Sequence, residues 1–152
     1  MKTLRKIVLI LSLFAAPALA DPDPAFEPVV ALFSAISKFD HSAMKGVVTE
    51  KFGLLENGEV WGIDELIAAV PPAEYKRENY YSLISTDVRE EIAVINYWNK
   101  AVFSSQQGTQ DVVWLESVVV VRENGEWLLQ QMHSTHVDPK KIPVSIVYAE
   151  MR

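Results

Sequence analysis

Glu116 and His133 are the two side chains of this sequence whose types and expected placement could carry out chemistry. They lie in two runs of strand-forming residues that are joined by Asn124-Gly125. Asn-Gly between apolar runs predicts a two-residue hairpin turn, because a type I′ turn needs positive φ at both central residues. The turn also sets the register of the two strands, and this register places the carboxyl group of Glu116 opposite the imidazole of His133.

The same register divides the predicted hairpin into two faces. The first face holds Trp114, Glu116, Val118, Val120, Leu129, Gln131, His133 and Thr135. The second face is more apolar and holds, among others, Val113, Leu115, Val119, Val121, Leu128 and Met132. A surface this apolar favours contact with another protein, so we expect a homodimer that forms through this face of the sheet.

A carboxylate beside an imidazole can serve as a general acid/base pair, because the carboxylate orients the imidazole and raises its pKa. Glu116 and His133 are therefore the candidate catalytic residues. The same pair fits two other roles, namely recognition of a ligand and a buried polar couple that only fixes the strand register. The residue pattern leaves these three roles open.

Aromatic and amide side chains on the predicted strands could line a small-molecule pocket around this pair. The candidate ligand-binding residues are Tyr81, Asn96, Trp98, Trp114 and Gln131. Alternation along residues 92–98 permits two arrangements, one with Asn96 facing inward and one with its neighbours Ile95 and Tyr97 facing inward.

The sequence predicts neither a metal site nor a cofactor site. His133 and His136 are three residues apart on a strand, so their side chains point to opposite faces and make a poor metal site. The chain has no Cys, no Gly-rich phosphate-binding loop and no Gly-x-Ser-x-Gly nucleophile motif.

The first twenty residues have the features of a secretory signal peptide. A basic start with Lys2, Arg5 and Lys6 precedes an apolar run, and small residues before Ala20 predict cleavage after it. The apolar run is about half of the roughly 20 residues that span a bilayer. We therefore expect a periplasmic or secreted protein whose mature part, residues 21–152, is a single domain. Cleavage removes Lys2, Arg5 and Lys6, so the net charge of the mature protein is more negative than the −6 of the full chain. A net negative charge disfavours binding to nucleic acid or to anionic membranes.

Hydrophobic periodicity predicts helices in the first half of the chain and strands in the second half. Helices are expected over residues 25–39, 41–47 and 64–70, with a small hairpin over 52–61 between the last two. Four consecutive strands should follow, with turns at Thr86-Asp87, 104–109 and Asn124-Gly125. This order predicts an α+β fold in which a curved antiparallel sheet wraps around the first helix. The tail 139–152 could form an edge strand, cover an opening of the sheet or contact a second copy.

Two groups of residues carry a resemblance to a known family. The first half contains Phe33, Asp40 and then Phe52-x5-Gly58-x2-Trp61-Gly62-x-Asp64-Glu65-Leu66. The second half ends in Asn124-Gly125-Glu126-Trp127-x5-His133-Ser134. Together with the order of the elements, these motifs resemble the nuclear transport factor 2-like superfamily, and more narrowly its SnoaL-like branch. The resemblance covers nearly all of residues 25–138.

The resemblance implies a cone-shaped α+β barrel whose curved sheet and helices enclose a pocket. It also implies that Trp127, Leu129, His133 and Thr135 on the final strand face the interior, in agreement with the turn register. The superfamily contains enzymes, transport factors and assembly domains, so its fold is compatible with three functions. These are an exported small-molecule-binding or accessory domain, an enzyme for proton transfer, isomerisation or dehydration of a small cyclic or carbonyl substrate, and a protein-interaction module with a filled barrel.

Overall fold

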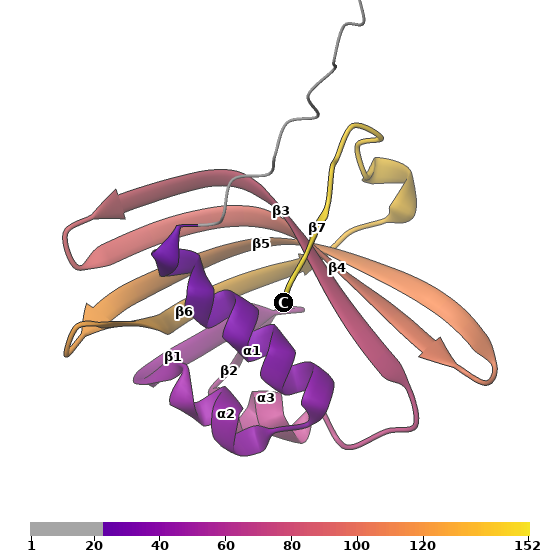
Figure 1. The fold of residues 1–152 in the computed structure, drawn as a ribbon, viewed down its shortest axis with the longest axis horizontal. Helices are drawn as coiled ribbons and strands as arrows, with labels where there is room; N and C mark the ends of the chain where they lie inside the picture. The colour runs from indigo at the N-terminus through magenta and orange to yellow at the C-terminus, as the bar shows by residue number, and fades with distance from the viewer. Residues whose placement is uncertain (1–22) are drawn as a thin grey trace, which may run out of the picture.

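A computed structural model describes residues 23–152, and its fold is α+β, as the sequence predicts (Figure 1). The predicted signal peptide, residues 1–20, lies outside the described residues. The helical elements are η1 (Pro24–Phe26), α1 (Glu27–Lys38), α2 (His41–Gly46), α3 (Ile63–Ala68) and η2 (Pro139–Lys141). The strands are β1 (Val48–Glu56), β2 (Glu59–Trp61), β3 (Lys76–Arg89), β4 (Ile92–Ser105), β5 (Gly108–Glu123), β6 (Glu126–His136) and β7 (Ala149–Glu150).

The seven strands form one sheet in the order β2-β1-β6-β5-β4-β3-β7. Strands β3 to β6 are an antiparallel meander, whereas β1 pairs parallel with β6. Helix α1 lies across the inner face of the curved sheet, and α2 and α3 lie next to one another near β1 and β2 (Figure 1). The sheet and the helices make the cone-shaped fold that the family resemblance implies.

Local sequence signals set the ends of the first helices. Pro24 and Pro28 lie in the first turns of η1 and α1, where a residue without an N–H is tolerated. Phe39 ends α1 in the left-handed conformation, with a φ of 54°. Asp40 then caps α2, because the backbone N–H of Ala43 donates to Asp40 Oδ1 at 3.0 Å.

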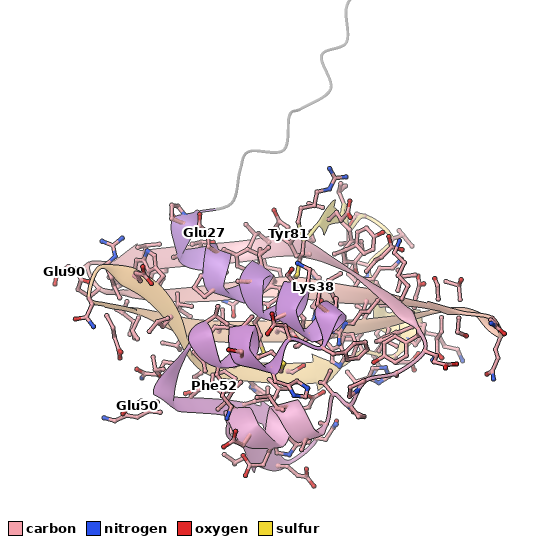
Figure 2. The ribbon with its side chains drawn as sticks, turned by 60° about the horizontal axis from the view of Figure 1, so that its bottom comes forward. Glu27, Lys38, Glu50, Phe52, Tyr81 and Glu90 are labelled. Atoms are coloured by element: carbon pink, nitrogen blue, oxygen red, sulfur yellow. The ribbon has the colours of Figure 1, made fainter. Side chains whose placement is uncertain are left out.

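The turn between β3 and β4 lies further along the chain than the sequence predicts. Strand β3 continues to Arg89, which pairs with Ile92, so the turn falls on Glu90 and Glu91. The predicted turn at residues 86–87 is wrong because Thr and Val side chains favour the extended ladder that this segment forms with β4. Figure 2 shows Glu90 at the far end of the sheet, beyond the helices.

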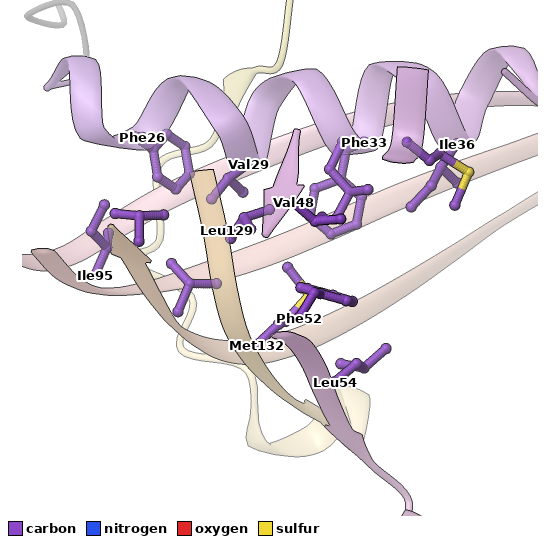
Figure 3. Close-up of a cluster of buried hydrophobic side chains, with 14 of the residues drawn as sticks. Phe26, Val29, Phe33, Ile36, Val48, Phe52, Leu54, Ile95, Leu129 and Met132 are labelled. Atoms are coloured by element: carbon purple, nitrogen blue, oxygen red, sulfur yellow. The ribbon is translucent and has the colours of Figure 1, made fainter. Parts of the chain in front are cut away.

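The core lies between α1 and the inner face of the sheet (Figure 3). Phe26 is fully buried, and the centre of its ring lies 5.0 Å from that of Tyr81 and 5.1 Å from that of Tyr97. The other buried apolar side chains include Val29, Leu32, Phe33, Ile36, Phe52, Leu54, Ile95, Val118, Val120, Leu129 and Met132. Helix α1 therefore supplies one side of the core and strands β1, β4, β5 and β6 supply the other.

The C-terminal tail forms an edge strand, which is one of the three alternatives that the sequence leaves open. Strand β7 pairs with the middle of β3, and Met151 just after it is buried in the core. Before β7, the tail lies on the outer face of the sheet, where Lys100 Nζ is 5.9 Å from the ring centre of Tyr148. The tail thus crosses from the outer face to the edge of the sheet and anchors there.

Candidate functional site

The register of the β5–β6 hairpin changes at a β-bulge. Near the turn the predicted register is confirmed, since Val120 pairs with Leu129. The register then shifts, so that Val119 pairs with Gln131 and Gln130 is the extra residue on β6. Beyond the bulge Glu116 therefore pairs with Ser134 and not with His133, and the predicted pairing is wrong.

The bulge also reverses which side chains of β6 face the interior. Met132 and Ser134 turn inward and are buried. The side chains that turn outward and are exposed are Gln131, His133 and Thr135. Glu116 lies inside and is 4% exposed. The two predicted catalytic side chains thus project from opposite faces of the sheet, because one added residue inverts the alternation along a strand.

Two residues of the predicted apolar outer face are buried. Met132 faces inward because of the bulge. Val113 is 7% exposed and lies beside Ile142 and Tyr148 of the tail, which covers it. Leu115 stays on the outer face and is 40% exposed.

The remaining predicted ligand-binding residues separate into three places. Trp114 lines the interior cavity described below. Tyr81 packs against the core at Phe26. Asn96 and Trp98 lie on the outer face of β4, because the buried side chains of this strand are those of Ala93, Ile95, Tyr97, Asn99 and Ala101. Asn96 Nδ2 donates to Ser85 Oγ at 2.9 Å on that face. The second of the two arrangements expected for residues 92–98 is therefore the observed one.

A cavity of about 220 Å³ lies inside the cone, between α1, α3 and the inner face of the sheet. Its lining residues are Phe33, Leu54, Glu56, Trp61, Leu66, Ala69, Val70, Arg77, Asn99, Trp114, Glu116, Met132 and Ser134. Figure 3 shows three of these residues in the hydrophobic core, with Phe33 at the helix and Leu54 and Met132 at the strands. A larger depression of about 730 Å³ lies between Tyr75 and the β4–β5 turn, but most of its lining is Ser, Thr, Gln and Gly. The interior cavity is the better candidate because charged groups converge there on apolar walls.

Glu116 is the buried carboxyl group of the cavity. Its Oε1 accepts hydrogen bonds from Asn99 Nδ2 at 3.2 Å and from Ser134 Oγ at 3.0 Å. The Tyr97 hydroxyl interacts with the same carboxyl group, although neither Tyr97 Oη nor Glu116 Oε2 has a partner at good hydrogen-bonding geometry. Burial raises the pKa of Glu116, the contacts with Tyr97, Asn99 and Ser134 lower it, and the charge of Glu56 raises it further. The net pKa lies above the ordinary value, so Glu116 holds a proton more tightly than an exposed Glu does.

Arg77 is the cation of the cavity, and the sequence reasoning missed it. Its Nε donates to Asn79 Oδ1 at 2.8 Å, and its guanidinium carbon lies 5.5 Å from the ring centre of Phe33 and 5.3 Å from that of Phe103. Burial lowers the pKa of Arg77, and the charges of Tyr75, Glu116 and Glu56 oppose this shift. Alternation along β3 could have revealed it, because residues 77, 79 and 81 share the inward face of that strand.

Glu56 is a second carboxyl group at the cavity and is half-buried. Burial raises its pKa, while the nearby Trp114 side chain and the charges of Arg77 and His136 lower it. The cavity thus combines one guanidinium and two carboxyl groups with aromatic and aliphatic walls. This arrangement can recognise a polar group on a small molecule and can hold a proton at Glu116.

Neither a cluster of metal ligands nor a membrane-spanning helix is present among the described residues. Among residues 23–152, no three His, Asp or Glu side chains lie together as metal ligands would. Within the same residues, no helix has the length and apolar character needed to cross a membrane.

Comparison with known proteins identifies the fold. No protein-family model and no curated protein matches the sequence. Among solved structures, an NTF2-like protein from Cytophaga hutchinsonii superposes with a TM-score of 0.61 at 14% identity, covering 78% of this chain and 100% of that one. The chain has the nuclear transport factor 2-like fold.

Other proteins with the nuclear transport factor 2-like fold have different descriptions. A ketosteroid isomerase-like protein from Erwinia carotovora atroseptica has a TM-score of 0.58 at 15% identity, covering 74% of this chain and 93% of that one. The CamKII hub homology domain of Chlamydamonas reinhardtii has a TM-score of 0.64 at 19% identity, covering 76% of this chain and 97% of that one. Identities this low establish the fold alone, and the SnoaL-like branch stays a prediction.

Proposed function

We propose that this protein is an exported domain that binds one small, partly apolar molecule in the interior cavity. The observation that carries the proposal is the convergence of Arg77, Glu56 and Glu116 on a cavity whose other walls are mostly apolar and aromatic. At about 30 Å³ per water-sized unit, a volume of about 220 Å³ accommodates roughly seven non-hydrogen atoms. The ligand is therefore smaller than a typical drug or steroid.

A second candidate function is an enzyme that catalyses proton transfer, isomerisation or dehydration in the same cavity. The observation that favours it is Glu116, a buried carboxyl group whose pKa is raised. The fold similarity to a ketosteroid isomerase-like protein is compatible with this candidate. His133 is exposed on the other face, so the proton would move through the cavity carboxyl groups, Glu116 and Glu56, and not through the imidazole.

Ligand screening by thermal shift tests the binding function. Ala69 is exposed at the cavity, so Ala69→Phe should block the cavity with little disturbance to the core. His133→Ala is the matched control, because it removes an exposed side chain from the outer face. We expect hits that stabilise wild type and His133→Ala equally but not Ala69→Phe. Turnover of a hit would favour the enzyme, whereas hits that also stabilise Ala69→Phe would contradict binding in this cavity.

Export is proposed from the sequence of residues 1–20. Expression of the full chain in a bacterium, followed by fractionation, should release the protein with the periplasm. N-terminal sequencing of that fraction should then begin at Asp21. A protein that starts at Met1 and stays in the cytoplasm would contradict this proposal.

Self-association through the outer face of the sheet is proposed as well. Ile92 and Val94 on β4 and Leu115 on β5 are between 40% and 45% exposed on this face. An apolar patch on a sheet face favours a second copy as its partner. We expect twice the monomer mass by light scattering at micromolar concentration and the monomer mass for Val94→Glu. A monomer mass for wild type would contradict the proposal.

A further inference from the structure

We propose that the ligand of the interior cavity is a small monocarboxylate whose carboxylate group pairs with Arg77. This inference rests on the proposed binding function and names the chemical class of the ligand. It depends on how Arg77 is held, on the charges that surround it and on the size and character of the cavity.

Two aromatic rings and one amide side chain surround part of the guanidinium group of Arg77. Phe33 and Phe103 are near it, with their ring centres 5.5 Å and 5.3 Å from its central carbon. Its Nε is already bonded to Asn79 at 2.8 Å. No hydrogen bond or ion pair engages Nη1 or Nη2 within residues 23–152. These two nitrogens form the edge that binds a carboxylate through two parallel hydrogen bonds.

Asn79 fixes the orientation of Arg77 before any ligand binds. Its Nδ2 donates to the carbonyl oxygen of Phe33 at 3.1 Å and to Ser37 Oγ at 2.6 Å, so it ties β3 to α1. Asn79 is itself 5% exposed. A guanidinium that is held from three sides loses little conformational freedom when a ligand binds, which favours affinity.

The charges around the cavity select an anion with a single charge. Arg77 is partly buried, and no carboxylate lies within 4.0 Å of it in the described chain, so an anion at its Nη edge would form the direct ion pair that Arg77 lacks. Glu56 and Glu116 are close enough to act on Arg77 electrostatically. Their charges would repel a bound anion in proportion to its charge, and this disfavours phosphate monoesters, which carry about −1.5 to −2 at neutral pH, more than it disfavours a monocarboxylate.

The remaining walls select an apolar body for the ligand. Leu54, Leu66, Val70, Met132 and the two indole rings of Trp61 and Trp114 face the cavity. Space for roughly seven non-hydrogen atoms leaves about four for the body once the carboxylate occupies three. A short aliphatic acid such as pentanoate meets these limits.

Calorimetric titration with pentanoate, pentanamide and inorganic phosphate tests the inference on the full mature protein. We expect wild type to bind pentanoate at least tenfold more tightly than pentanamide or phosphate. Arg77→Met should weaken pentanoate binding at least tenfold. Arg122→Met is the matched control, because Arg122 also lies over an aromatic ring, 4.7 Å from Trp127, but is exposed and away from the cavity.

The wild-type comparison of acid and amide needs no variant, so the inference stays testable if Arg77→Met does not fold. Equal affinities for pentanoate and pentanamide would refute recognition of the carboxylate group by Arg77 and would leave the proposed binding function intact. If neither pentanoate nor pentanamide binds, the proposal of a monocarboxylate ligand is refuted. The wider thermal-shift screen then decides the binding function separately. Equal losses of pentanoate affinity in Arg77→Met and Arg122→Met would also overturn the inference.

Discussion

Replacing Glu116 by Gln should make the free energy of unfolding less dependent on pH. Burial raises the pKa of Glu116 in the folded protein above 4.5, the ordinary value that the unfolded chain restores. The folded protein therefore holds the proton more tightly than the unfolded chain does. The stabilising contribution is complete below pH 4.5 and is lost as the pH rises through the folded pKa, because the buried group must then become a carboxylate.

The size of the effect follows from one proton. Within the window between the two pKa values, the free energy of unfolding of wild type falls by up to about 1.4 kcal/mol per pH unit relative to the variant. The Gln side chain keeps an oxygen that can accept from Asn99 Nδ2 and Ser134 Oγ. It cannot ionise, so the penalty for burying a charge is absent from the variant at every pH.

Urea unfolding from pH 4 to pH 8 measures this difference. Glu123→Gln is the matched control, since it removes one negative charge from an exposed residue beside the β5–β6 turn. We expect the stability of Glu116→Gln relative to wild type to increase with pH and that of the control to change less. The reasoning about burial would be refuted if the free energy of unfolding of Glu116→Gln minus that of wild type stays constant, or decreases, as the pH rises.

Three further substitutions or truncations test the fold, each by urea unfolding. Phe26→Ala should cost about 3–5 kcal/mol, because it removes a fully buried ring between two tyrosines; a loss below 1 kcal/mol would contradict that packing. Gly125→Ala should cost about 1 kcal/mol or more, because φ is +90° there with open space around the position, whereas Gly46→Ala, with no positive φ, should not destabilise. A chain that ends at residue 148 should lose about 1.5–3 kcal/mol with the buried Met151, and unchanged stability would show that β7 does not anchor the tail.

The bulge at Gln130 shows where prediction from local signals stops. The Asn124-Gly125 turn sets the register of its nearest pairs, and Val120 opposite Leu129 confirms it. Further along, Leu129 and Met132 are both buried although they are three positions apart, and the two glutamines between them are not buried. The extra residue places both apolar side chains in the core, so the packing of the curved sheet decides the register there. The spacing of the two apolar residues around Gln130-Gln131 was the available signal.

The sequence by itself determined the helices, the Asn57-Gly58 and Asn124-Gly125 turns and the α+β class, because periodicity and turn chemistry act over a few neighbouring residues. Only the tertiary structure decided the site. Arg77 meets Phe33 from α1 and Phe103 from β4 inside the cone, and Glu116 meets Ser134 only after the bulge. These contacts join residues far apart in the chain, so they depend on how the sheet curves over the helix rather than on any local pattern.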